Sequence, residues 1–147
     1  MAFTLEDRQA VQDLLVRFAY AVDVECTEEE FLDIFTEDAI MDGPFTGYSQ
    51  GREGLLKFIR GTFGRRSRVQ VRHVLTNFLI TGDDREAGLK AYFLGFKTEF
   101  HPEPPKEPVT ELLYAGHYDC AARKVNGTWK LARRTIRLDT KPEKKAG

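Results

Sequence analysis

The spacing of the apolar residues changes once along this 147-residue chain, and that change limits its fold more than any other feature. As far as about Phe63, apolar side chains recur every three or four residues, as in an amphipathic helix. From Val69 onward they alternate with polar side chains, as in strands with one buried face. Helices followed by long hairpin-linked strands are typical of an α+β domain whose helices cover one face of a sheet.

Three helices are predicted in the first part of the chain. Thr4 can cap the first, and apolar residues at helical spacing continue from there to Val22. A short second helix is predicted at Glu28–Thr36, followed by an extended stretch at Ala39–Asp42. The third is predicted at Gly51–Phe63, ahead of a basic loop around residues 65–68.

Four long strands are predicted after these helices. The first begins at Val69, and the others cover about residues 87–100, 109–124 and 128–139. Residues 101–108 contain four prolines and must form an exposed loop or pocket rim, because proline removes backbone donors from a ladder. Strands of this length twist and coil, which leaves a concave face. We therefore expect one domain at residues 1–140 and a flexible tail at 141–147.

Composition narrows the classes of function. The 22 basic and 23 acidic residues nearly balance, so no nucleic-acid or membrane partner is expected. No apolar run of about 18 residues is present, and the N-terminus lacks the pattern of a signal peptide, so we expect a cytoplasmic protein. Cys26 and Cys120 lack the spacing of a zinc site, and no metal site is predicted.

Two polar residues fall where apolar ones are expected. Asp23 lies in the last turn of the first helix, about 100° from the centre of its apolar stripe, so its carboxylate can face the core. His73 shares the strand parity of Val71 and Leu75, which places an imidazole on the inward face. If Asp23 binds Nδ1 of His73, Nε2 is left to take a proton from a bound carbon acid. The alternatives are a solvated helix-end acid and a structural core histidine.

Several segments resemble a known family. YAVD, FLDIFTEDAIMDGP, GREGLLKFI, RHVLTNFLI and AGHYDCAARKVNGTWKLARR are similar to the SnoaL-like branch of the nuclear-transport-factor-2-like superfamily, over about residues 5–139. The resemblance implies a cone-shaped α+β fold, also called cystatin-like. It further implies a cofactor-free pocket at the open end and a homodimer formed through the outer sheet face.

Within that superfamily the chain looks most similar to the group of scytalone dehydratase, hexachlorocyclohexane dehydrochlorinase and bile-acid 7α-dehydratase. The resemblance implies a His-Asp pair for elimination, at Asp23 and His73. A basic residue of the last strand assists in some members, and Arg134 or Arg137 would match it. Unbroken alternation from Trp129 favours Arg137 as the inward one.

The proton donor is where the chain departs from that group. Scytalone dehydratase has a second pocket histidine on a later strand, and residues 91–98 show no clear equivalent. A tyrosine phenol or His117 could donate instead. Asn77 could orient substrate or secure a bend in the sheet. The candidate substrate-binding residues are Tyr20, Tyr48, Asn77, Tyr92, Tyr114, His117 and Tyr118. On a regular strand only one of His117 and Tyr118 can face the pocket, and Tyr114 shares the parity of Tyr118.

Together these features predict a cofactor-independent lyase of the dehydratase type. Its substrate would be a small, largely apolar cyclic molecule such as a polyketide or steroid. A polyketide cyclase or ketosteroid-type isomerase would begin with the same proton abstraction. A non-catalytic subunit like the β subunit of ring-hydroxylating dioxygenases, or a stand-alone binding module, is the alternative of a different class.

Overall fold

The computed structural model describes residues 2–44, 46–63, 69–100 and 107–139. The predicted basic loop, most of the proline-rich loop and the predicted tail lie outside the described residues. In the described part of the chain, no helix is both long enough and apolar enough to span a membrane.

The described elements form one six-stranded sheet and three helices. The strands are hydrogen-bonded in the order β2-β1-β6-β5-β4-β3, and every pair is antiparallel except β1 with β6. The elements in chain order are α1 (Leu5–Asp23), α2 (Glu28–Asp33), β1 (Phe35–Gly43), β2 (Gly47–Gln50), α3 (Gly51–Phe63), β3 (Val69–Gly82), β4 (Glu86–Glu99), β5 (Val109–Val125) and β6 (Thr128–Leu138).

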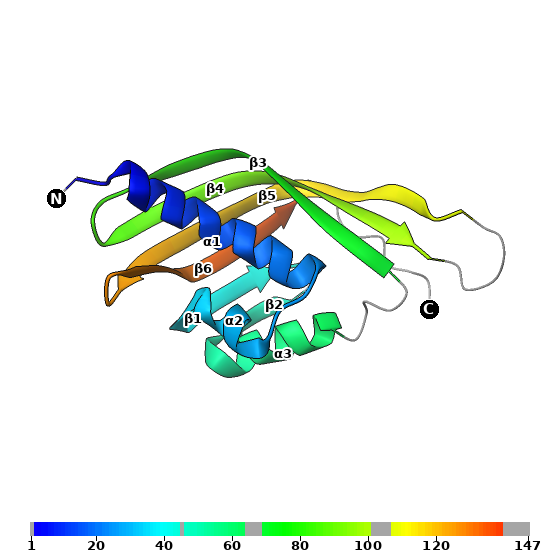
Figure 1. The fold of residues 1–147 in the computed structure, drawn as a ribbon, viewed down its shortest axis with the longest axis horizontal. Helices are drawn as coiled ribbons and strands as arrows, with labels where there is room; N and C mark the ends of the chain where they lie inside the picture. Colours follow the sequence, from blue (N-terminus) through cyan, green and yellow to red (C-terminus); the bar gives the residue numbers. More distant parts are fainter. Residues whose placement is uncertain (1, 45, 64–68, 101–106, 140–147) are drawn as a thin grey trace.

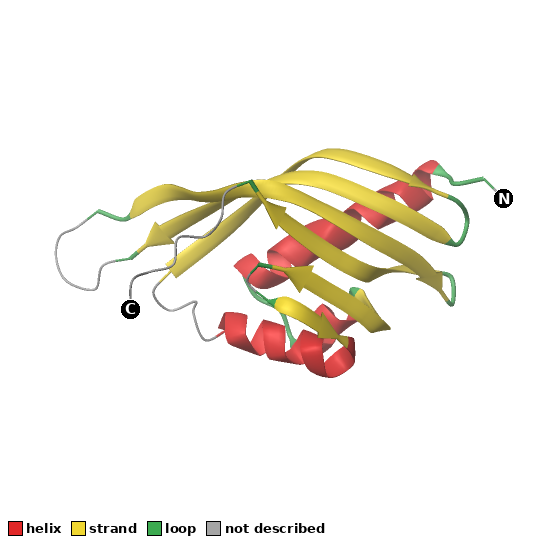
Figure 2. Ribbon diagram, turned by 180° about the vertical axis from the view of Figure 1, so that it is seen from behind, coloured by secondary structure: helices red, strands yellow, loops and turns green. Residues whose placement is uncertain are grey.

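The helices lie on one side of a strongly curved sheet. Helix α1 runs across that face, while α2 and α3 lie beside β1 and β2 at the other edge (Figure 1). Seen from behind, the opposite face of β3, β4 and β5 is not covered by any of the described helices (Figure 2). The predicted α+β architecture is therefore confirmed.

Two local predictions were incomplete. The second helix ends at Asp33 rather than Thr36, and the chain continues directly into β1. The cause is tertiary, because the N–H of Leu131 donates to the carbonyl of Ile34 at 2.8 Å and β1 then pairs with β6. The short strand β2 was not predicted, since its four residues, GYSQ, carry no apolar alternation.

The core lies between α1 and the concave sheet face. Val11, Leu15 and Phe18 of α1 are at most 2% exposed, and they meet inward residues such as Leu89 and Phe93 of β4. Each large side chain buried in this way contributes about 1.5–3 kcal/mol. This packing fixes α1 on the sheet and so fixes the position of its last residue.

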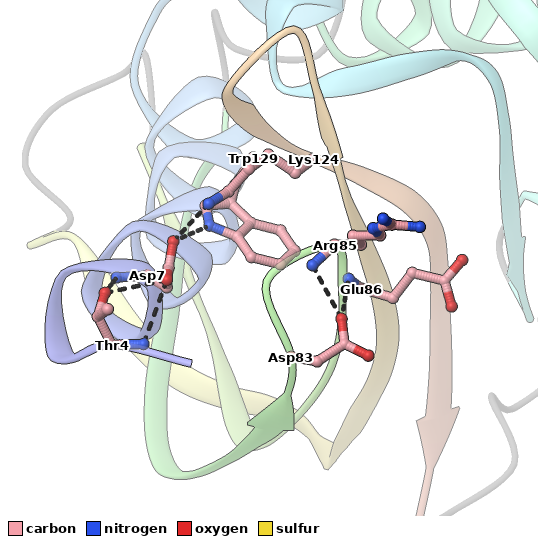
Figure 3. Close-up of polar contacts among 7 residues, drawn as sticks. All are labelled: Thr4, Asp7, Asp83, Arg85, Glu86, Lys124 and Trp129. Carbon is pink, nitrogen blue, oxygen red and sulfur yellow. Dashed lines mark hydrogen bonds and ion pairs between the residues drawn. The ribbon is translucent and has the colours of Figure 1, made fainter. Parts of the chain in front are cut away.

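The first turn of α1 is also anchored to the β5–β6 hairpin. Thr4 and Asp7 form a capping box, in which the Asp7 N–H donates to Thr4 Oγ1 at 3.0 Å. The Asp7 carboxylate also accepts hydrogen bonds of 2.8 Å from Lys124 Nζ and Trp129 Nε1 (Figure 3). These bonds, with that from Lys124 as the largest cause, hold the pKa of Asp7 well below its usual value. One side chain therefore caps the helix and fastens it to the sheet.

We expect Asp7→Asn to destabilise the protein at pH 7. Because the folded-state pKa of Asp7 is depressed, its contribution is present above the unfolded pKa of about 4 and is lost as the pH falls toward the folded pKa. The difference between wild type and variant should therefore shrink below about pH 4. Urea unfolding at pH 7 and at acidic pH measures it. Asp13→Asn in the same helix, which loses only a contact with Gln9, is the control; equal effects of both variants would contradict the anchoring role.

Candidate active site

The end of α1 meets the middle of β3 through a buried pair of side chains. Asp23 is the last residue of α1 and is 7% exposed, and the side chain of His73 is 12% exposed. Asp23 Oδ1 lies 2.6 Å from His73 Nδ1, and Asp23 Oδ2 accepts the backbone N–H of His73 at 2.6 Å. The carboxylate thus holds both the ring and the backbone of the same residue. Hydrogen bonding at Nδ1 favours the neutral tautomer whose Nε2 lone pair is available.

A third residue holds the end of the helix in place. Gln70 Nε2 donates to the backbone carbonyl of Asp23 at 2.6 Å and to that of Val71 at 2.8 Å. The first bond satisfies a carbonyl that has no partner within the helix. Sequence reasoning missed Gln70, because nothing in its spacing distinguishes it from an ordinary polar strand residue.

The other ring nitrogen of His73 faces aromatic side chains. Nε2 lies 3.5 Å from the hydroxyl of Tyr114 on β5. The ring of Phe93 on β4 is centred 6.1 Å from the imidazole and 5.6 Å from the ring of Tyr114. The structure therefore brings Tyr114 to the predicted pair, in largely apolar surroundings.

The expectation that Arg137 faces inward was wrong. The ladder between β5 and β6 shifts register, so that Ala122 pairs with Leu131 but Ala121 pairs with Arg133. The extra residue, Ala132, reverses the alternation. Arg134 is consequently 3% exposed on the inner face. The side chain of Arg137 is 55% exposed, 3.8 Å from the Asp42 carboxylate.

Arg134 is a buried cation that has no acidic partner in the described part of the chain. Its guanidinium carbon lies 5.0 Å from the ring centre of Phe18, 5.6 Å from that of Phe58 and 5.9 Å from that of Tyr118. Its Nε is buried and has no hydrogen-bond partner among the described residues. Aromatic faces offset only part of the cost of burying a charge, which is several kcal/mol. A site of this kind favours an anionic or strongly polarised oxygen as its partner.

The two titratable neighbours of Arg134 do not supply that negative charge. Burial raises the pKa of the Tyr118 phenol well above its usual value, although the charge of Arg134 opposes the shift. Burial likewise raises the pKa of the Cys120 thiol to about 12. Both groups are neutral at pH 7, so the charge of Arg134 is not compensated by either of them.

The remaining predicted residues are distributed over both faces of the sheet. Tyr118 faces inward, with its ring 4.9 Å from that of Phe93. His117 is exposed on the opposite face. Asn77 is exposed at a bulge in β3 with φ of 55°, so it bends the strand rather than facing the pair. Three of the predicted tyrosines are 60–66% exposed: Tyr20, Tyr48 and Tyr92.

The link between Arg134 and the Asp23–His73 pair runs through aromatic rings. Tyr118 contacts Arg134 on one side and Phe93 on the other, and Phe93 contacts His73. The inner face thus combines a hydrogen-bonded imidazole, a phenol and a guanidinium on an apolar surface. Such a set can remove a proton from carbon, donate one to oxygen and stabilise an oxyanion.

Comparison with known proteins agrees with this description. The model of the SnoaL-like domain matches residues 4–135. A proposed aromatic ring hydroxylase from Novosphingobium aromaticivorans is 32% identical, with a TM-score of 0.74 over 93% of this chain and 92% of its own. A Nostoc punctiforme protein of unknown function with a cystatin-like fold is 26% identical, with a TM-score of 0.74 over 95% and 96%.

A more distant structure has the same fold. A proposed scytalone dehydratase from Novosphingobium aromaticivorans is 21% identical, with a TM-score of 0.72 over 97% of this chain and 92% of its own. No curated protein matches the sequence significantly.

Proposed function

Because the chain belongs to the SnoaL-like domain family, we propose that it is a cofactor-independent lyase that removes water from a small, largely apolar cyclic substrate. A polyketide-like or steroid-like ketone suits the aromatic inner face. One observation carries the proposal: the Asp23 carboxylate is hydrogen-bonded to both Nδ1 and the backbone N–H of His73, at 2.6 Å each.

In this proposal, His73 is the general base. Its Nε2 removes a proton next to the substrate carbonyl, and the Asp23 carboxylate stabilises the imidazolium that forms. A positioned base of this kind contributes about 10²–10⁴-fold to the rate. No step requires a metal or organic cofactor.

Arg134 takes the role that the sequence had favoured for Arg137. Proton removal next to a carbonyl places negative charge on the carbonyl oxygen, and a buried guanidinium stabilises such charge strongly because little water competes. The absence of an acidic partner among the described residues supports this role, since an Asp or Glu carboxylate paired with Arg134 would already neutralise the guanidinium.

Product analysis tests the function directly. We expect the protein to convert 3-hydroxycyclohexanone, a simple cyclic β-hydroxyketone, to cyclohex-2-enone and water. ¹H NMR measures this conversion. Movement of a double bond in cyclohex-3-enone without loss of water would instead favour an isomerase, which uses the same base. No turnover of either ketone would contradict the lyase proposal and favour a binding module or a non-catalytic subunit.

The relative named as an aromatic ring hydroxylase makes the non-catalytic subunit the second candidate. A subunit that only assists assembly needs neither the Asp23–His73 pair nor an unpartnered buried Arg134. Purification of the chain alone separates the two, because a subunit would depend on a larger partner for solubility.

We also expect a homodimer formed through the uncovered sheet face. Val74, Tyr92 and Leu94 lie on that face and are 45%, 60% and 37% exposed. Val74 pairs with Leu94 across β3 and β4, and Tyr92 is two residues from Leu94 along β4. A contiguous exposed apolar patch commonly marks an interface. Val74→Glu should shift sedimentation equilibrium toward monomer, whereas Thr81→Glu, exposed near the end of the same strand, should not. A monomeric wild-type protein at tens of micromolar would contradict this expectation.

A further inference from the structure

The hydroxyl of Tyr114 lies beside the ring nitrogen that the proposed function uses as its base, 3.5 Å from His73 Nε2. We infer that Tyr114 is the proton donor to the leaving hydroxyl, and that Gly95 is the positioning residue that allows it to be there. This inference rests on the proposed function and names the acid that the sequence left open.

Gly95 stands between the two side chains in the sheet. His73 pairs with Gly95 across β3 and β4, and Gly95 pairs with Tyr114 across β4 and β5. Neighbouring strands are about 4.8 Å apart, so Tyr114 must span a whole strand to reach β3. A Cβ at Gly95 would collide with the ring of Tyr114. The phenol therefore reaches His73 by lying over the one position in that row without a side chain.

A bulge lies in β5 directly before Tyr114, which is the first side chain of that strand, in chain order, to face inward. The pairing of β4 with β5 shifts by one residue next to the Gly95–Tyr114 pair. Phe96 pairs with Leu112, so Leu113 is an extra residue of β5. Leu112 and Leu113 are 58% and 46% exposed, whereas Tyr114 is partly buried. The bulge thus ends the buried face at the phenol, where a substrate can meet it.

The proton balance closes with these two residues. His73 Nε2 takes the proton next to the carbonyl, and the electron pair of that C–H bond forms the C=C bond. The C–O bond breaks, and its electron pair leaves with the oxygen, which takes the phenolic proton of Tyr114 and departs as water. Transfer of the Nε2 proton to the resulting phenolate, across the observed 3.5 Å contact, restores both residues. A hydroxyl is a poor leaving group without a donor, and this donor needs no proton from solvent.

The other tyrosines do not occupy such a position. Tyr20, Tyr48 and Tyr92 are mostly exposed. Tyr118 lies deeper, between Phe18, Phe93 and Arg134, and in the described part of the chain its hydroxyl makes no hydrogen bond to Asp23 or His73. Tyr114 is therefore the phenol that the geometry favours as the acid.

The test compares two probes that share a ring but differ in their need for an acid. 3-Hydroxycyclohexanone loses hydroxide, which requires protonation, and 3-(4-nitrophenoxy)cyclohexanone loses a stable phenolate, which does not. Tyr114→Phe keeps the ring and should lower kcat for the first probe by about 100-fold or more, but for the second by less than about 10-fold. Thr81→Val, which removes a hydroxyl from an exposed residue of β3 outside the proposed site, is the control and should change neither rate.

The outcomes separate this inference from the proposed function. If Tyr114→Phe lowers both rates equally, or neither, Tyr114 is not the acid, although His73 can still be the base. If His73→Gln retains the rate with the nitrophenoxy probe, the proposed base is wrong. If the wild-type protein acts on neither probe, both proposals fail together.

Gly95→Ala tests the positioning role while residue 114 remains a tyrosine. The added methyl should displace the Tyr114 ring, reproduce the leaving-group dependence of Tyr114→Phe, and shift the ¹⁵N resonance of His73 Nε2. Gly88→Ala is the matched control on the same strand, because its Cβ would meet only Thr81 Oγ1, at an ordinary 3.7 Å. An unchanged rate ratio and an unchanged Nε2 resonance in Gly95→Ala would overturn the role of Gly95.

Discussion

Asp23→Asn is expected to lower kcat/KM for 3-hydroxycyclohexanone by about 10³–10⁴-fold while the protein remains folded. The reason is a mismatch of hydrogen bonds. Asp23 accepts two N–H donors, one from the His73 ring and one from its backbone. Asparagine offers one acceptor oxygen and one NH₂ group, so one of those donors must lose its acceptor. If the oxygen keeps the backbone bond, the NH₂ group donates to Nδ1 and places the imidazole proton on Nε2.

That tautomer has no lone pair where the substrate proton must be taken, so the base is lost although the ring remains. The variant also lacks the charge that stabilises the imidazolium. Asp33→Asn is the matched control, because Asp33 also ends a helix but, among the described residues, its carboxylate binds Arg17 and Lys130 alone. Steady-state kinetics and circular dichroism of both variants measure the effect. A folded Asp23→Asn protein within tenfold of wild-type kcat/KM would contradict the role of Asp23.

Arg134→Met is expected to change activity and stability in opposite directions. If Arg134 stabilises the oxyanion as proposed, its removal should lower kcat by about 10²–10³-fold. The same change removes a charge whose burial costs several kcal/mol, offset only by contacts with three aromatic faces. Methionine is flexible and can occupy the space of the arginine stem. We therefore expect the free energy of unfolding to rise by about 1–3 kcal/mol.

Arg137→Met is the control for this variant. Arg137 lies three residues away on the same strand, but its side chain is 55% exposed and 3.8 Å from Asp42, so its ion pair contributes about 0–1 kcal/mol. Its effects on kcat and on unfolding should both be small. If Arg134→Met destabilises the protein by several kcal/mol, Arg134 is a structural residue with partners, and its proposed role is wrong.

Much of the fold follows from local patterns in the sequence. The apolar stripe of α1 and the Thr4 cap predict the first helix, and the structure places that helix at Leu5–Asp23. The parity of β3 up to Leu75 predicts an inward His73, and the helix period predicts that Asp23 can face it. In the structure the two side chains lie within hydrogen-bonding distance. Periodicity was enough for these predictions, because no bulge lies between Asp23 or His73 and the apolar residues whose spacing was used to place it.

Strand irregularities limit what periodicity can predict. Bulges at Asn77, Leu113 and Ala132 each add one residue and reverse the faces beyond them. None carries a glycine or proline that would mark it in the sequence. The inward arginine was misplaced for this reason alone, since alternation from Trp129 holds only as far as Leu131.

Other features of the site depend on contacts between distant elements. The bond from Gln70 to the end of α1 joins residues 47 apart in the sequence. The space over Gly95 exists only when Tyr114 lies beside it. Periodicity in the sequence therefore predicts the Asp23–His73 pair, whereas the position of the Tyr114 phenol and of the buried Arg134 guanidinium requires the register of the sheet.

Deuterium exchange tests the central claim most directly, because it requires the base but no leaving group. Cyclohexanone in D₂O should exchange its α protons faster with the wild-type protein than in buffer, as followed by ¹H NMR at constant pH. With His73→Gln, which keeps a polar side chain of similar reach, the account predicts exchange at the buffer rate. Exchange by His73→Gln at the wild-type rate would contradict the claim that His73, held by Asp23, removes a proton from carbon.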